Sequence, residues 1–227
     1  MTEPADVPEM TDAATPALRD ARRAWILGGA LLTAYAVMVL VLGGYPGLIP
    51  GVAGGVLLDL LWAAALLVLA LGVRRAGSVV ARRPLGVVAL AVAAAVPFAS
   101  MLLWTVVPPD PRDDAGIVML GQGLMVLSLA ALVVAGVVIG RAGAVPPRVR
   151  WLPLIVIAVA AAAQIAVQIV VVAAGTNLAQ PELVVLVMGA PMLGTLGALL
   201  LGILTIVFAP RDEPRRDGPV QVYPPAA

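Results

Sequence analysis

Residues 151–174 read WLPLIVIAVAAAAQIAVQIVVVAA, and this stretch decides the fold. It carries no charged side chain, and its only amide side chains are Gln164 and Gln168. A transmembrane α-helix needs about 20 consecutive, predominantly apolar residues to cross a bilayer core about 30 Å thick. The stretch therefore predicts a helix that crosses a membrane.

Five further stretches have the same length and the same apolar character. They are separated by residues that end helices, such as Pro108-Pro109-Asp110-Pro111 and Arg82-Arg83-Pro84. We therefore expect an all-α fold, a polytopic integral membrane bundle of six transmembrane helices. The expected spans are Ala24–Gly43, Gly54–Val73, Leu85–Val107, Gly116–Gly140, Trp151–Ala174 and Leu183–Ala209.

The composition supports a protein that faces lipid. Of the 227 residues, 62% are hydrophobic and 12% are charged, whereas a soluble domain has about 25% charged residues. A fold surrounded by lipid needs no polar exterior. We expect one six-helix transmembrane domain over residues 24–209. Residues 1–23, which are acidic, and residues 210–227, which are rich in proline, are expected to be disordered tails.

The arginines predict the orientation in the membrane. If there are six spans, every arginine except Arg112 falls on one side, in the two tails and in the second and fourth connections. Because basic residues accumulate on the cytoplasmic side, both termini are expected in the cytoplasm. All basic residues are arginine, and Ala, Gly, Val, Leu and Pro dominate the rest. This usage fits GC-rich codons and favours the plasma membrane of a bacterium.

The residue inventory excludes several classes of function. The chain has neither Cys nor His, so a disulfide, a thiolate nucleophile, a Ser-His-Asp triad and a Cys or His metal site are excluded. Without these residues and without lysine, most acid–base and nucleophilic schemes lack a member. We expect no enzymatic activity, no cofactor and no metal. A net charge of +1 gives no reason to expect nucleic-acid binding.

Few polar side chains lie at membrane depth, and they are the candidate site. A polar group in hydrocarbon is costly, so its position is informative. The candidates for ligand binding or pore lining are Asp59, Gln122, Gln164, Gln168 and Glu182, which fall mostly in the halves of the spans away from the arginines. Two interpretations stay open: these groups line an outward-facing polar pocket, or the amides join helices by hydrogen bonds and Asp59 is hydrated near the interface.

Small residues and two prolines also recur within the spans. Residue pairs at a spacing of four, such as Ala30 and Ala34 or Gly136 and Gly140, favour close helix packing in lipid. Pro97 and Pro191 each remove one backbone hydrogen bond from a span and invite a kink.

Two functions are compatible with these observations. The first is a small-molecule transporter, or the membrane subunit of a transport complex, with an outward-facing polar pocket. ATP hydrolysis would then need a partner subunit, because the sequence has no Gly-x-x-x-x-Gly-Lys-Ser/Thr motif. The second is a membrane scaffold or accessory protein that transports nothing. The expected partners are the lipid bilayer, an ATPase or membrane subunit, and a second copy of this chain.

Overall fold

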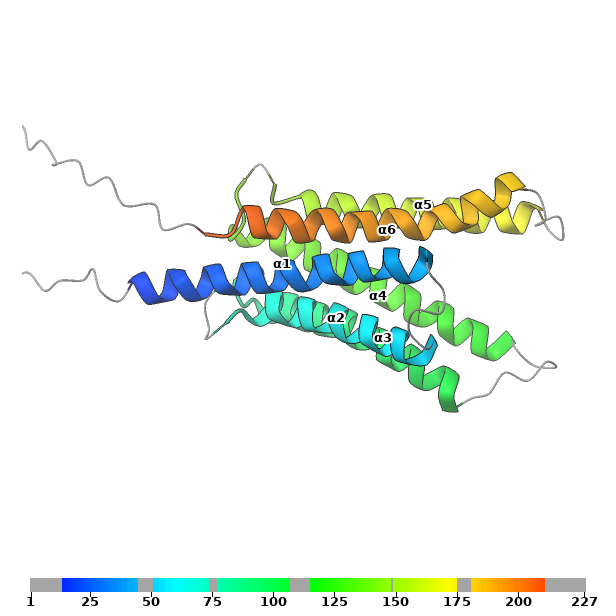
Figure 1. Ribbon diagram of the computed structural model, residues 1–227, viewed down its shortest axis with the longest axis horizontal. Coiled ribbons are helices and arrows are strands. Elements are labelled where there is room, and N and C mark those ends of the chain that lie inside the picture. The colour runs from blue at the N-terminus through cyan, green and yellow to red at the C-terminus, as the bar shows by residue number, and fades with distance from the viewer. Residues whose placement is uncertain are drawn as a thin grey trace, which may run out of the picture.

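A computed structural model describes residues 14–44, 51–73, 77–106, 115–147, 149–174 and 181–210. These residues form six α-helices (Figure 1), so the predicted fold class is confirmed. Five of the helices are long and apolar enough to cross a membrane, and α6 has 27 residues with an apolar stretch over Pro191–Val207. The helices are α1 (Ala14–Gly44), α2 (Gly51–Leu71), α3 (Pro84–Val106), α4 (Ala115–Ala142), α5 (Leu152–Ala174) and α6 (Pro181–Val207).

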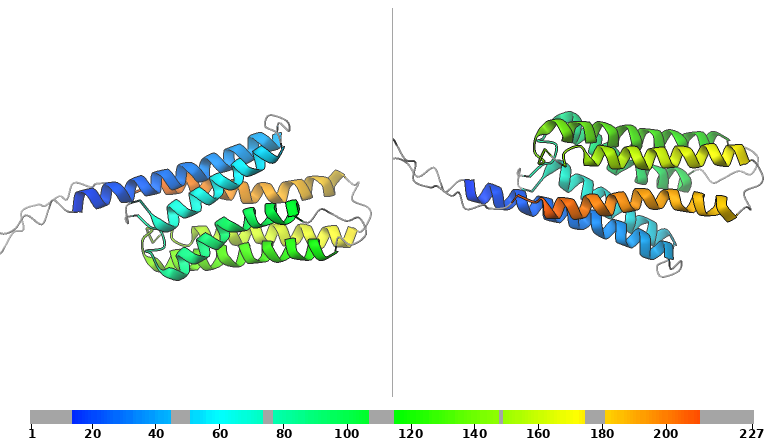
Figure 2. Two further views of the ribbon diagram at one scale, coloured as in Figure 1. Left: turned by 90° about the horizontal axis from the view of Figure 1, so that it is seen from below. Right: turned by 90° about the horizontal axis from the view of Figure 1, so that it is seen from above.

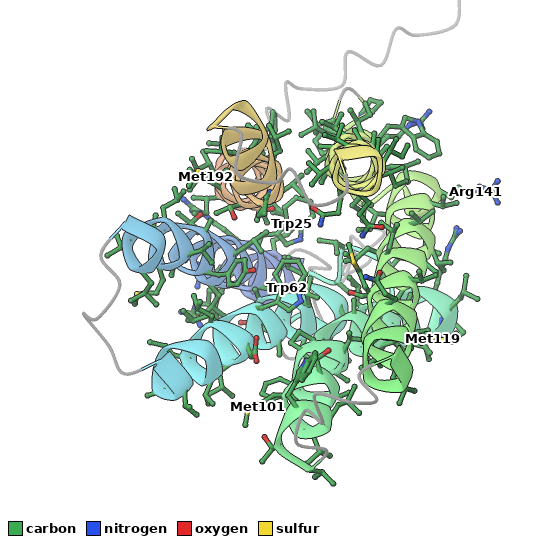
Figure 3. All side chains as sticks on the ribbon, turned by 90° about the vertical axis from the view of Figure 1, so that its right-hand side faces the viewer. Trp25, Trp62, Met101, Met119, Arg141 and Met192 are labelled. Atoms are coloured by element: carbon green, nitrogen blue, oxygen red, sulfur yellow. The ribbon has the colours of Figure 1, made fainter. Side chains whose placement is uncertain are left out.

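The six helices form a closed ring. Each helix packs against its neighbours in the sequence, and α6 returns to pack along α1 (Figure 2). Among the described residues, no helix brings its backbone close to that of a helix on the opposite side of the ring. Viewed end-on, the helices surround a centre that none of the six helices occupies (Figure 3). This arrangement leaves room for a cavity where a compact bundle would place helix-to-helix contacts.

Glycines set the closest approach in the ring, between α1 and α6. A Cβ atom at Gly29 would lie 2.7 Å from the Gly202 carbonyl oxygen, and a Cβ atom at Gly202 would lie 2.9 Å from the Gly29 carbonyl oxygen. Small residues at such positions allow helix backbones to meet in lipid. Ala30 and Ala34, which the spacing argument proposed for this purpose, are exposed. The face of α1 that packs against α6 therefore contains Gly29, and it is offset by one residue from the predicted face with Ala30 and Ala34.

The described arginines all lie at one end of the ring, here called the arginine end; the opposite end is called the far end. Arg19, Arg22 and Arg23 belong to the first turns of α1, Arg82 and Arg83 to the α2–α3 connection, and Arg141 and Arg150 to the α4–α5 connection and its flank. Both α1 and α6 have their outer termini at this end (Figure 1). The predicted segregation of arginine is thus present in the fold.

Helix α1 corrects one expectation about the tails. It begins at Ala14, so the last ten residues of the segment 1–23 that was expected to be disordered are helical. The physical reason is that a hydropathy window ends where charges begin, whereas a helix can continue beyond the bilayer into water, where Arg19 and Arg23 are exposed and Asp20 pairs with Arg23 at 3.8 Å. Residues 1–13 and 211–227 lie outside the described part of the chain.

The α2–α3 connection folds back under the ring, and residues Gly77–Arg83 are here called the plug. The Val79 amide donates to the Leu69 carbonyl at 3.0 Å, which fixes the plug to the end of α2. The Trp25 indole Nε1 donates to the Gly77 carbonyl at 2.9 Å, which fixes it to α1. Val80 is completely buried and belongs to the largest apolar core, together with Ala70 and residues of α3 and α4.

The Trp25 hydrogen bond gives a first prediction. Trp25→Phe removes the donor and leaves the partly buried Gly77 carbonyl unpaired, which we expect to cost about 1 kcal/mol. For a chain of this size the melting temperature should fall by about 2–4 °C. Thermal unfolding of the purified protein in mild detergent measures the change. Trp104→Phe is the matched control, because Trp104 is 51% exposed on α3. Equal melting temperatures for both variants would contradict a role of the bond in holding the plug.

Candidate functional site

A cavity of about 740 Å³ occupies the centre of the ring, and all six helices line it. This volume lies within the range of about 300–1,000 Å³ that is typical of small-molecule sites. Most of the wall is aliphatic, from residues such as Leu32, Leu66, Leu132, Ala160 and Leu201. Because each helix contributes only one face, the cavity is a consequence of the ring and belongs to no single helix.

The arginine end of the cavity is lined by a layer of large apolar side chains. This layer contains Val79 of the plug, Val145 and Val149 of the α4–α5 connection, Trp25 of α1 and Phe208 after α6. The hydrogen bonds of the plug described above hold Val79 in place. Within this layer Trp25 and Val79 are buried, whereas Phe208 is 38% exposed.

Aromatic side chains of α1 and α2 form a rigid part of the wall. The Tyr35 and Trp62 rings have their centroids 5.2 Å apart with an interplanar angle of 47°. The Trp62 indole Nε1 donates to the Ala93 carbonyl of α3 at 3.3 Å, so its polar atom is already paired. In the end-on view Trp62 lies toward the middle of the ring (Figure 3). Tilted aromatic pairs of this kind fix each other's orientation, which gives the cavity a defined shape.

The wall offers a ligand three glutamine amides, besides the hydroxyls of Tyr35 and Ser128. Gln122 of α4 and Gln164 and Gln168 of α5 all line the cavity, and within the described residues none of them is hydrogen bonded to protein. The threonines of the wall differ, because Thr195 and Thr205 donate to the carbonyls of Pro191 and Leu201 in their own helix turn. An amide both donates and accepts hydrogen bonds, so the glutamines can pair with many uncharged polar groups.

The α4–α5 seam, the line along which α4 faces α5, is tight near the arginine end. There a Cβ atom at Gly136 would lie 3.4 Å from the Leu154 Cβ atom, and the Trp151 ring covers Gly140. Gly136 and Gly140 thus pack as their spacing predicted. Toward the far end α4 diverges from α5 (Figure 1). Helix separation in this half leaves the inward faces of both helices accessible.

The open half of the seam is the mouth of the cavity. Val126 of α4 is 64% exposed and Ile165 of α5 is 56% exposed, yet both line the cavity. Gln122 and Gln168 are likewise exposed and likewise line it. Together with the divergence of α4 from α5 in this half (Figure 1), the exposure of these side chains indicates that the wall is interrupted here. The cavity therefore opens sideways between the far halves of α4 and α5.

The remaining sequence candidates lie elsewhere. Asp59 is half-buried on α2 and does not line the cavity, although it lies within electrostatic range of the Tyr35 hydroxyl. Trp62, one turn further along α2, occupies the wall instead. Glu182 belongs to the first turn of α6, and its side chain lies outside the described part of the structure. The structure thus brings together the three glutamines and separates Asp59 from them.

Sequence reasoning missed the aromatic and closing residues of the site. Trp25, Tyr35 and Trp62 look like ordinary residues of an apolar span, and nothing in their spacing sets them apart. Val79 and Val145 fall in connections, where hydropathy gives no reason to expect a cavity wall. The one signal available was that Trp25 and Trp62 are bulky aromatics within segments otherwise rich in small residues.

The electrostatics of the wall are simple. No lining residue among those that the structure describes carries a charge, and the described residues include no cluster of acidic side chains that could hold a metal ion. The arrangement can therefore enclose an apolar group and hydrogen-bond a polar one. It offers no described group that would neutralise a charged ligand.

No known protein family, no curated protein and no solved structure matches this chain.

Proposed function

We propose that the chain is a small-molecule transporter, or the membrane subunit of a transport complex, and that its cargo binds in the cavity of the helix ring. The observation that carries the proposal is the cavity of about 740 Å³, which is lined by six helices and by three amides that no described residue hydrogen-bonds. Between helices of a bundle such a cavity is the default site for a small ligand. A scaffold has no need for this cavity and would be more stable with a packed centre.

The orientation of the chain adds to the proposal. The excess of arginine at one end supports a cytoplasmic location of that end under the positive-inside rule. The layer with Val79 and Phe208 then faces the cytoplasm, and the mouth between α4 and α5 lies in the outer half of the membrane. In this orientation the polar pocket opens sideways in the outer half of a bacterial plasma membrane.

Filling the cavity tests the proposal. Ala161 of α5 lines the cavity, whereas the adjacent Ala162 is exposed and does not. We expect Ala161→Trp to occupy the cavity and weaken the binding of a resident small molecule roughly tenfold or more, because overpacking a site costs about 1–3 kcal/mol. Ala162→Trp adds the same side chain outside the cavity and should have no effect.

The measurement is native mass spectrometry of the protein released from lipid nanodiscs, with identification of the small molecules that remain bound. A molecule retained by the wild type and by Ala162→Trp, but lost from Ala161→Trp, is the expected cargo, and its uptake by proteoliposomes can then be followed. If the three proteins retain the same molecules in the same amounts, the cavity is not a binding site. The result would then favour the alternative function, a membrane scaffold or accessory protein.

A further inference from the structure

We propose that the ligand of the cavity is an uncharged amphiphile with one apolar tail, which enters sideways from the lipid through the α4–α5 seam and places its polar group against Gln122, Gln164 and Gln168. The inference rests on the proposed function, because it names the ligand class and the entry route of the same cavity.

The route follows from the register of α4 and α5. The two helices run in opposite directions and touch where Gly136 meets Leu154. Gln122 and Gln168 are each fourteen residues further toward the far end, which corresponds to about 21 Å along either helix. The two amides therefore lie at the same level on opposite sides of the mouth. A molecule that passes through the mouth passes between them.

The placement of the amides predicts how the ligand is oriented. Gln164 and Gln168 are four residues apart and share one face of α5, and both line the cavity. Deeper in the cavity the wall is mostly aliphatic; the hydroxyls of Thr195 and Thr205 donate within their own helix, and Ser128 adds a single hydroxyl on α4. The capacity for hydrogen bonding is therefore concentrated near the mouth, whereas an apolar tail is stabilised throughout the interior. The ligand therefore enters tail first and stops at the amides.

The absence of charge on the described wall selects against ions. A carboxylate or an ammonium group inside the cavity would lose its hydration without a described counter-charge, since no described lining residue is charged. An amide can pair with a hydroxyl or an ester of a neutral molecule through the hydrogen bonds that it would otherwise lack. The matching class is a single-chain neutral lipid of the monoacylglycerol type.

Fluorescence quenching by brominated lipids tests the ligand class. The chain has four tryptophans, of which Trp25 and Trp62 line the cavity. In the background W104F/W151F only these two remain, so a bromine atom that quenches them has entered the ring. The probes are dibromostearoyl glycerol, dibromostearic acid and dibromostearylamine, titrated into phosphatidylcholine nanodiscs. We expect saturable quenching by the neutral glycerol ester and only weak, linear quenching by the two charged probes.

Substitutions of the amides test the inferred ligand class, whereas a substitution that fills the cavity tests the proposed function. Gln122→Leu/Gln168→Leu should weaken the apparent affinity for the glycerol ester roughly tenfold, since two hydrogen bonds are lost. Ala161→Trp should abolish saturable quenching by any probe, because it fills the site. If Ala161→Trp has no effect, the proposed function fails. If Ala161→Trp abolishes quenching but the acid or the amine binds as tightly as the ester, only the inferred ligand class is overturned.

A chemical staple tests the entry route. The chain has no cysteine, so a pair of introduced cysteines is the only pair of thiols. Val126→Cys/Ile165→Cys joined by a short bismaleimide bridges the mouth, and we expect the rate of quenching to fall at least several-fold. Gly136→Cys/Leu154→Cys, whose Cβ atoms would lie within disulfide range in the closed part of the seam, is the control and should leave the rate unchanged. Equal rates for both staples would overturn lateral entry.

Discussion

Gly202→Val is expected to prevent the ring from closing between α1 and α6 and to abolish the stable fold. The Cβ atom would lie 2.9 Å from the Gly29 carbonyl oxygen and 2.9 Å from the Thr33 amide nitrogen. Overpacking costs about 1–3 kcal/mol where side chains can move aside, and here two of the obstacles are backbone atoms. The two helices must separate, and the first and last spans then lose their main contact.

Size-exclusion chromatography and thermal unfolding in mild detergent measure this effect. We expect Gly202→Val to give aggregated protein, or a melting temperature lowered by more than 10 °C, since a large domain loses about 2–4 °C per kcal/mol. Gly194→Val is the matched control on the same helix, because no atom lies within 4 Å of a Cβ at Gly194. Both variants carry the same cost of a β-branched residue in a helix. A monodisperse Gly202→Val protein as stable as Gly194→Val would show that α1 and α6 are not in contact.

Gly77→Ala is expected to have the second largest effect, because it displaces the plug from α1. Gly77 has a φ of +78°, in the left-handed region where a Cβ costs about 1–2 kcal/mol. The added Cβ would also lie 2.7 Å from the Ala21 Cα atom and 2.8 Å from its carbonyl oxygen. The plug must move away from α1 and release the Trp25 hydrogen bond.

Gly143→Ala separates the two causes of the expected loss of stability, which are the backbone strain and the steric clash with α1. Gly143 has a φ of +70°, but no atom lies within 4 Å of a Cβ at this position. It therefore shares the backbone strain of Gly77→Ala without the clash. We expect thermal unfolding to show a larger loss of stability for Gly77→Ala, by about 2 kcal/mol. Equal losses for the two variants would mean that the plug does not pack on α1 as described.

The number and the limits of the helices could be predicted from the sequence because they depend on local properties. Lipid requires each spanning segment to satisfy its own backbone hydrogen bonds, so a long apolar stretch can only be a helix. The expected span Leu85–Val107 and helix α3 (Pro84–Val106) differ by one residue at each end. The start of α1 at Ala14 was missed because its first turns carry Arg19, Arg22 and Arg23, and hydropathy detects only the part of a helix inside the bilayer.

The order of the helices around the ring, and with it the cavity, could not be predicted in this way. The spans are apolar on every face, so periodicity does not show which face of α2 points inward. For this reason Asp59 was expected at the site as an ionisable group within a span, although Trp62 takes the wall position on α2. Gln164 and Gln168 could be assigned to one face because their spacing alone places them together. Gln122 joins them only through the register of α4 on α5.

The proposed function and the inferred ligand both require a cavity inside the ring. The mobility of a spin label tests most directly whether this cavity exists. A single nitroxide-labelled cysteine is placed at Ala161, which lines the cavity, or at Val167, which is 7% exposed on the same helix and does not line it. In nanodiscs at room temperature we predict a mobile spectrum for the label at Ala161 and a strongly immobilised one for the label at Val167. Strong immobilisation at both positions would mean that the helices pack to the centre and that there is no cavity.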